Sequence, residues 1–285
     1  MAMQGVVRFI RFALAALLGL VLLALSVIYL GSEFIIRRTY AAQLRPLAAA
    51  PAAAQIDEGR RLATLMGCNG CHEANLQGGE FFSEPHVATI HASNLTLALQ
   101  NYTSEQFEAA VRQGIRNDGR SLFAMPSSAF AAVADEDLAS IEAYLRSHPP
   151  AGERRPALSA GIIGRIGLLI GEFKPEAVLV REGRRLEPFQ LGPEHERGRY
   201  LARVVCSECH DLDLSGGPEN PDLAIAAAYD LDDFRTLMRT GVAAGGRDVG
   251  LMSRVARGRF TSFTDEEIGQ LHAYLVARSQ RVPGR

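Results

Sequence analysis

The residues of this sequence best suited to chemistry are its four cysteines. They occur in two copies of one pattern, in which two cysteines stand three positions apart and a histidine follows directly. The first copy begins GCNGCHEANLQGGE at Gly67, and the second begins VCSECHDLDLSGGP at Val205. The motif residues are Cys68, Cys71 and His72, and Cys206, Cys209 and His210. No cysteine is left over.

Three common uses of cysteine pairs do not account for this pattern. A disulfide gives no reason for a histidine behind each pair. A zinc site built from two C-x-x-C pairs usually has them about 15–20 residues apart, whereas Cys71 and Cys206 lie in different halves of this chain. A thioredoxin-like redox pair needs a βαβ setting, and the flanking sequence does not have one.

Covalent haem attachment explains both the cysteines and the histidines, because C-x-x-C-H is its signature. Two thiols on one helical turn reach the two vinyl groups at one porphyrin edge, and the next histidine directs its imidazole at the iron. The sequence therefore predicts two covalently bound haem c groups, with His72 and His210 as the first iron ligands.

A second iron ligand is expected from two methionines that align between the copies. Met125 follows Tyr102 by 23 residues, and Met252 follows Tyr229 by 23 residues. We expect both in loops between the middle and last helices, where a side chain reaches the open face of a haem. Other methionines and histidines lack a counterpart or lie in other segments: Met66, Met238, His86, His91, His148, His195 and His272.

Histidine and methionine ligation has a functional consequence. The thioether is a soft neutral ligand that favours ferrous iron and raises the reduction potential. An iron with six ligands has no open position for a substrate or for oxygen. The predicted haems therefore pass single electrons, and we expect an electron-transfer protein rather than an enzyme.

The two motifs belong to an internal repeat of a small helical domain. YTSEQFEAAVRQGI in the first half matches YDLDDFRTLMRTGV in the second, and each copy closes with a helix, DEDLASIEAYLRS or DEEIGQLHAYLVA. Thr103 with Gln106, and Thr264 with Glu267, form the pattern of a capping box at a helix start. Convincing β alternation is missing, so the predicted fold class is mostly α, with two tandem domains of one kind.

The N-terminus carries an uncharged run of 21 residues from Phe12 to Ser32. At about 1.5 Å per residue, a helix of this length crosses a bilayer core of about 30 Å. A cleaved signal peptide usually has a shorter apolar region and small residues at its cleavage site, whereas Tyr29, Glu33 and Phe34 occupy that place here. We therefore expect an uncleaved anchor, with a cleaved signal peptide as the alternative.

Haem attachment also predicts the topology, because haem c is normally attached outside the bacterial cytoplasm. The sequence thus predicts a single-pass protein of the bacterial inner membrane with its haem domains in the periplasm. The expected segments are an anchor over 1–34, a tether over 35–54, domains over 55–148 and 193–285, and a linker over 149–192. The apolar linker core, GIIGRIGLLIG, is too short to span a membrane. It is a strap across the two domains, an interfacial segment, or a contact for another subunit.

The repeat resembles the class I c-type cytochromes, and most of all the membrane-anchored cytochrome subunits of periplasmic dehydrogenases such as alcohol dehydrogenases. The resemblance rests on GCNGCH, LQGGEFF, HASNLT and VRQGIRNDGRSLFAMPSSAF in copy one. In copy two it rests on YLARVVCSECHDLDLSGG, LMRTGV and GLMSRVARGRFTSFTDEEIGQLHAYL. It covers roughly residues 55–148 and 193–280.

The resemblance implies that the first and last helices of each domain cross near the haem edge, with Tyr144 and Tyr274 as the aromatic of the last helix. It also implies that a proline carbonyl accepts the N–H of the ligand histidine, from Pro85 in copy one and from Pro221 or Pro218 in copy two. The chain departs from such subunits in two ways. They often carry three haem domains, and they are often anchored at the other end.

These observations together predict a dihaem cytochrome of a respiratory chain. It would relay electrons from a dehydrogenase or quinol-oxidising donor to a downstream cytochrome or oxidase. The alternatives are a dihaem peroxidase-like enzyme and a haem subunit of a terminal oxidase complex. The formal net charge of −2, without a clustered basic stripe, argues against a nucleic-acid partner.

Overall fold

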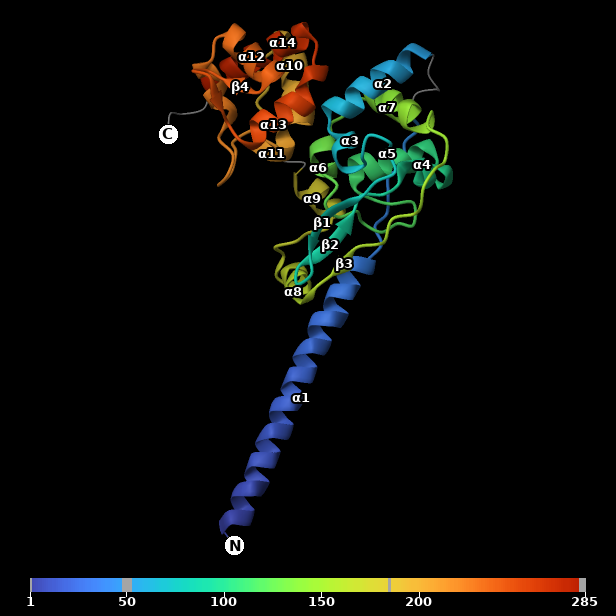
Figure 1. Cartoon of the computed structure of the whole chain (residues 1–285), viewed down its shortest axis with the longest axis vertical. Coiled ribbons are helices and arrows are strands. Elements are labelled where there is room, and N and C mark those ends of the chain that lie inside the picture. The colour runs from blue at the N-terminus through green and yellow to red at the C-terminus, as the bar shows by residue number, and fades with distance from the viewer. Residues whose placement is uncertain (1, 48–52, 184–185, 282–285) are drawn as a thin grey trace.

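A computed structural model describes residues 2–47, 53–183 and 186–281. One long helix, α1, projects from a body in which the two sequence copies form two small helical lobes (Figure 1). Copy one lies nearer α1, and copy two lies beyond it. The fold class expected from the sequence is confirmed: a long N-terminal apolar helix is followed by two helical domains of one kind.

Helix α1 runs from Ala2 to Arg37 and includes the whole apolar run. Among the described residues it is the one helix long and apolar enough to cross a membrane, with a mean hydropathy of 2.7 in its most apolar part. Most of its large apolar side chains are exposed in the isolated chain, which fits a helix that has no protein neighbour along most of its length.

Copy one is built from short helices with long connections. They are α2 (Ala53–Leu65), α3 (Cys68–Cys71), α4 (Leu95–Ala98), α5 (Ser104–Gln113), α6 (Ser127–Phe130) and α7 (Asp135–Arg146), with a 3₁₀ turn, η1 (Leu99–Asn101), after α4. Both side-chain and backbone bonds of the capping box at Thr103 and Gln106 are present, as predicted.

Copy two repeats this order. Its elements are η2 (Pro193–His195), α10 (Glu196–Leu201), a π-helical segment η3 (Ala202–Cys206), α11 (Ser207–His210), η4 (Leu223–Ala228), α12 (Leu231–Thr240), α13 (Leu251–Gly258), η5 (Phe260–Ser262) and α14 (Asp265–Ser279). The predicted capping box at Thr264 and Glu267 is also present.

Each copy of the mostly helical fold also contains a few short strands. Strands β1 (Glu80–Glu84) and β2 (Ala88–His91) form an antiparallel hairpin in copy one, and β3 (Ser159–Ala160) from the linker adds to it. A second small pair joins β4 (Val242–Ala243) to β5 (Arg247–Asp248) in copy two. These strands are too short for periodic alternation to reveal them in the sequence.

The first and last helices of each copy cross at a glycine, as the resemblance implied. A Cβ built on Gly59 of α2 would overlap the backbone carbonyl of Ser140 on α7, and it would lie 3.0 Å from Tyr144 Cβ. In copy two, Gly198 of α10 meets the carbonyl of Gln270 and Cβ of Tyr274 on α14 in the same way. Only glycine permits this close approach of two backbones.

The apolar core of the linker lies against α1 and copy one in the described structure, rather than across the two domains. Helix α8 (Ile162–Ile170) packs against the C-terminal end of α1, and helix α9 (Glu176–Gly183) packs on α5 and α6 of copy one. The residues after α1 are also held, because Tyr40 N–H donates to Gly119 O at 2.8 Å and its ring packs with Ile115 and Ala177. Residues 48–52, which belong to the expected tether, lie outside the described residues.

The two lobes share a polar interface and one continuous apolar core. Arg203 of copy two is only 3% exposed, and it donates to the carbonyl oxygens of Ala129 at 2.7 Å and Ser128 at 2.9 Å in copy one. Arg61 of α2 reaches Glu267 of α14 at 2.8 Å. Because a buried guanidinium is costly unless its donors are satisfied, these bonds favour one arrangement of the lobes.

Candidate functional site

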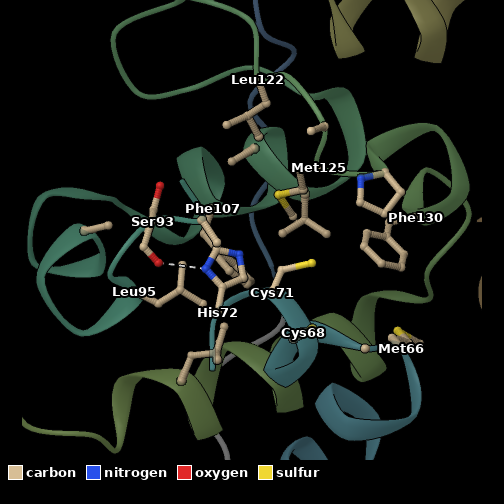
Figure 2. A pocket seen from close by; sticks show the side chains of 18 of the residues that line it. Met66, Cys68, Cys71, His72, Ser93, Leu95, Phe107, Leu122, Met125 and Phe130 are labelled. Carbon is tan, nitrogen blue, oxygen red and sulfur yellow. Dashed lines mark hydrogen bonds between the residues drawn. The ribbon is translucent and has the colours of Figure 1, made fainter. Parts of the chain in front are cut away.

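The first cysteine motif forms part of the wall of an apolar cavity in copy one. Cys68 and Cys71 begin and end the single turn of α3, and His72 follows at its C-terminus. All three side chains line the cavity, and Figure 2 shows His72 and Met125 both turned into it. The remaining lining is mostly apolar and comes from Leu95, Leu99, Phe107, Leu122, Phe130 and Leu138, among others.

A hydrogen bond to the backbone orients the His72 ring. Its Nδ1 donates to the backbone carbonyl of Ser93 at 2.7 Å, which leaves Nε2 as the ring nitrogen able to bind a metal (Figure 2). A carbonyl partner of this kind fixes the tautomer of a ligating histidine and makes it a better donor to the metal. The expected partner, Pro85, is wrong: it lies at the turn between β1 and β2, and the loop after β2 supplies the carbonyl instead.

In copy two the same bond is made by a proline. His210 Nδ1 donates to Pro221 O at 2.8 Å, which confirms Pro221 and leaves Pro218 without this role. His210 is 9% exposed, and Cys206 and Cys209 lie directly before it at the junction of η3 and α11.

The loop behind each histidine has the same unusual backbone in both copies. The residues one and four places after the histidine have positive φ although they are not glycine: Glu73 and Leu76 in copy one, Asp211 and Leu214 in copy two. Such conformations are uncommon for residues with a side chain and cost of order 1 kcal/mol or more each. Because both copies have positive φ at the same two places, the loop behind the histidine has the same backbone conformation in each lobe.

Met125 and Met252 have different local settings. Met125 lies in a loop just before α6, as expected, and the preceding Ala124 is held at a φ of 63°. Met252 is the second residue of α13, so the expectation that it lies in a loop is wrong. Both methionines are partly buried against the main core. The structure places Met125 in the lining of the first cavity. The role of Met252 as the second iron ligand of copy two stays a prediction.

Two residues set aside on sequence grounds also line the first cavity: Met66, in the turn after α2, and His91, at the end of β2. The Nδ1 atom of His91 is buried and has no hydrogen-bond partner in the described structure. His91 has no counterpart in copy two and is therefore not a repeated ligand, but a role confined to one copy leaves no signal in the repeat. Met238 is 3% exposed in the core of copy two, as its helical face predicted.

The donor set fits a covalently attached haem. Neither cysteine pair is joined in a disulfide, and burial raises the pKa of the Cys68 thiol to about 11 and that of the Cys206 thiol to about 12 before any attachment. Neither Cys68 nor Cys206 is therefore the exposed, low-pKa thiolate of a redox-active pair. A mostly apolar cavity with two thiols on one side, one free imidazole nitrogen, a thioether and an unpaired buried histidine nitrogen suits a large apolar macrocycle that carries iron and a few polar groups.

The structure also reveals a contact between the two motifs that the sequence did not suggest. Arg259 of copy two packs on Gly67 and lies 3.4 Å from a Cβ built on Gly70, within the first motif. The same guanidinium forms an ion pair with Glu208 at 2.9 Å, inside the second motif, and Glu208 lines the first cavity. The sequence gives little indication of this ion pair, because arginines and glutamates are common and nothing in their spacing shows which of them meet.

A comparison with known families agrees with this geometry. The model of the family described as "Cytochrome c" matches residues 56–149 and again residues 195–279. The two matched stretches correspond to the two lobes, and each contains one complete C-x-x-C-H motif.

Individual relatives were found among curated proteins. The chain is 29% identical to the fructose dehydrogenase cytochrome subunit of Gluconobacter japonicus over 81% of its own length and 54% of the relative's. It is 26% identical to the cytochrome c subunit of alcohol dehydrogenase (quinone) from Gluconacetobacter polyoxogenes over 78% and 55%. It is 25% identical to a diheme cytochrome c-type protein of Cereibacter sphaeroides over 55% and 57%. The chain thus spans about half the length of these relatives.

Proposed function

This chain belongs to the cytochrome c family and carries two covalent haem c groups, and from that premise we propose that it is a membrane-anchored electron-transfer subunit that serves a dehydrogenase. The observation that carries the proposal is the repeated site. In both lobes a histidine after two cysteines is held by one backbone carbonyl, on a loop with the same pattern of positive φ.

The proposed roles follow from the positions of the side chains. Cys68, Cys71, Cys206 and Cys209 would attach the haems through thioether bonds, and His72 and His210 would bind the irons through Nε2. Met125 and Met252 would supply the second axial ligands. A haem iron with two protein ligands exchanges one electron at a time. The chain's own contribution is to hold the ligands still and to exclude water with apolar walls, which keeps the site similar in both redox states.

The contact between the motifs supports a relay from one lobe to the other. Arg259 touches the first motif and pairs with Glu208 of the second, so the two attachment sites meet at the interface between the lobes. The ion pairs and hydrogen bonds of Arg61 and Arg203 hold the interface together on either side. We propose that electrons cross between the lobes at this place.

We further propose the location. Helix α1 would span the bacterial inner membrane without being cleaved, and both lobes would lie in the periplasm. This proposal keeps the division into an anchor over 1–34, a tether over 35–54, cytochrome domains over 55–148 and 193–285, and a linker over 149–192. Its support is the single long apolar helix among the described residues, together with the export that haem attachment requires.

The donor is proposed from the relatives, whose names describe cytochrome subunits of fructose and alcohol dehydrogenases. The proposed donor is therefore a dehydrogenase that oxidises a small organic substrate, and the proposed acceptor is a downstream cytochrome or oxidase.

Purification in a mild detergent, followed by identification of the proteins that remain bound, tests the proposal. We expect a dehydrogenase catalytic subunit to copurify, and its substrate to reduce both haems of the complex. A reduced-minus-oxidised spectrum and the intact mass, measured first, should report two covalent haems per chain. Substrate-independent oxidation by peroxide at a high-spin haem would contradict the proposal and favour the peroxidase-like alternative. Copurification with a terminal oxidase alone would favour the oxidase subunit.

A further inference from the structure

Helix α8 presents a continuous apolar face that nothing in the described structure covers. The face is formed by large side chains that are between 39% and 71% exposed: Ile162, Ile163, Ile166 and Ile170. Their spacing of one, three and four positions places them on one side of a helix. The opposite side, with Gly164, Gly167 and Leu168, is buried. Phe173, just beyond the helix, is 47% exposed and extends the apolar surface.

The single charged residue of α8 is turned away from this face. Arg165 donates to Ser32 Oγ at 2.8 Å and to Glu33 Oε1 at 2.9 Å, and its guanidinium lies 4.2 Å from the centre of the Tyr29 ring. Its side chain is only 13% exposed. The charge of α8 is therefore paired with α1, and the outward face remains purely apolar.

These contacts place α8 at one end of the apolar run of α1. Leu169 packs on Gly31, and Arg165 reaches the next two residues of α1. The run from Phe12 to Ser32 covers about 30 Å of helix, the thickness of a bilayer core. A segment attached at its end lies at the depth of the lipid headgroups, where a tyrosine such as Tyr29 is commonly found.

The other side of α8 is tied to the haem domain. Gly161 N–H donates to Val87 O at 2.9 Å, and Ile163 N–H donates to His86 O at 2.8 Å, at the turn between β1 and β2. Strand β3 pairs with β2 immediately before α8 begins. Figure 1 shows α8 beside this hairpin, where α1 leaves the body. Helix α8 thus connects the end of α1 directly to copy one.

We propose that α8 is a second membrane contact, which lies along the periplasmic surface of the bilayer with its apolar face among the lipid headgroups and upper acyl chains. Helices in this position bury an apolar face about 5–10 Å into the boundary between headgroups and acyl chains, and the other side of α8 is buried against the protein. The occupant is lipid rather than a protein because the face continues the exposed apolar surface of α1 at the depth where a bilayer would end. Two attachments would fix the orientation of copy one towards the membrane.

Environment-sensitive fluorescence at α8 tests this inference. Since thioether bonds are expected to consume all four native cysteines, one introduced cysteine gives a single labelling site. The variant Ile170→Cys carries the label at the most exposed position of the face, and Ile163→Cys repeats the measurement at a second position. The full-length holoprotein is placed in lipid nanodiscs that contain phospholipid with a spin-labelled quencher, near the headgroup in one sample and near the end of the acyl chain in a second, which reports on the middle of α1. Iodide serves as the aqueous quencher.

The inference rests on the proposal that α1 spans the bilayer, so two matched labels separate the outcomes. Leu22→Cys lies in the middle of α1, and Ala273→Cys lies exposed on α14, far from α1. We expect both α8 labels to be quenched by the lipid probe several-fold more than Ala273→Cys, and to be protected from iodide.

If Leu22→Cys is quenched by lipid but both α8 labels respond only to iodide, the inference on α8 is wrong while the span remains. Protection of the α8 labels from both quenchers would also overturn it, because a protein would then cover the face. If Leu22→Cys is not quenched by lipid, the span itself is wrong.

Discussion

At the scale of single residues, the first site depends on which side chains can reach the iron. Met125 and Met66 both line the cavity that contains His72, so the lining alone does not distinguish them. Met125 belongs to a loop whose preceding residue, Ala124, has a positive φ, and strain of this kind persists where a surrounding structure requires it. Met125 is also the methionine with an aligned counterpart in copy two, which makes it the proposed ligand.

We predict that Met125→His lowers the midpoint potential of one haem by on the order of 100 mV, within the ~0.8 V range that axial ligands span. An imidazole is a stronger donor than a thioether and stabilises ferric iron. A redox titration followed by absorbance measures the effect. Met66→Leu is the control, because it keeps the cavity wall apolar and should leave both potentials nearly unchanged. If the midpoint potential changed in Met66→Leu and stayed the same in Met125→His, Met66 rather than Met125 would be the iron ligand.

The carbonyl that holds His210 depends on a glycine. Gly216 has a φ of 73°, and a Cβ built on it would overlap Asn220 O and would lie 2.6 Å from Pro221 O, the atom that accepts the His210 N–H. The neighbouring Gly217 has room, because its nearest neighbour is Asp211 Oδ2 at 3.8 Å. A side chain would therefore fit at Gly217 but would collide with the backbone at Gly216.

Replacement of Gly216 by alanine should displace the Pro221 carbonyl and weaken the hold on His210. The expected cost is about 1–3 kcal/mol of folding stability from the strained φ, together with a change in the potential of the copy-two haem. Thermal unfolding and a redox titration of the holoprotein measure both. Gly217→Ala is the matched control and should resemble the parent protein. Equal effects of the two substitutions would mean that this loop does not position His210.

At the scale of elements, α9 supplies a buried carboxyl beneath the methionine loop. Glu176 is 5% exposed, and its Oε2 has no hydrogen-bond partner within the described part of the chain. The side chain faces the backbone of Ser127 and Ser128 at the start of α6. Burial raises its pKa from the ordinary 4.5 to about 7, although the backbone donors of α6 act in the opposite direction. A linker helix thereby places an ionisable group close to the loop of Met125.

This pKa predicts how stability depends on pH. A carboxyl whose pKa is higher in the folded state stabilises that state fully below pH 4.5, and this contribution is lost as pH rises through about 7. Glu176→Gln removes the cost of burying a charge, so above pH 7 the variant should be more stable than the parent by up to about 3 kcal/mol. At pH 5 the difference should be much smaller.

Chemical denaturation of the holoprotein at pH 5 and pH 8 measures this difference. Glu182→Gln is the control on the same helix, because Glu182 is 53% exposed and pairs with Lys174 at the surface. It should change stability little at either pH. A Glu176→Gln variant with the same stability difference at both pH values would show that Glu176 does not titrate in this range.

At the scale of the whole molecule, the interface between the lobes decides how the two sites influence each other. Arg259 is 26% exposed and touches the first motif while it pairs with Glu208 in the second. One cation is therefore close to the attachment points of both haems, where it favours the reduced form of each.

Arg259→Gln should lower both midpoint potentials, each by on the order of 50 mV for a unit charge at this kind of distance in a partly buried site. A redox titration with two components measures the shifts. Arg239→Gln is the control, because Arg239 forms a comparable pair with Asp265 at 2.8 Å but lies away from both motifs. A shift in only one potential would mean that the two haems are not both close to Arg259.

The sequence by itself determined the chemistry and the plan of this protein. The haem-attachment motif consists of residues that lie within four positions of each other. The duplication, the capping boxes and the apolar run of α1 are also local or periodic patterns. Such patterns survive without knowledge of the fold, because one helical turn or one continuous helix contains all the information. This is why the cysteines and the helical class could be predicted from the residues alone, whereas Tyr144, Tyr274 and a proline partner for His210 were expected only from the resemblance to class I c-type cytochromes.

Only the tertiary structure decided which distant segments meet. It replaced Pro85 with Ser93 as the partner of His72, placed Met252 on a helix, and brought Met66 and His91 to the first cavity. It also joined Arg259 to Glu208 and seated α8 on the end of α1. These contacts link residues far apart in the chain, and they depend on how whole helices pack. The spacing of residues along the sequence carries no information about that packing.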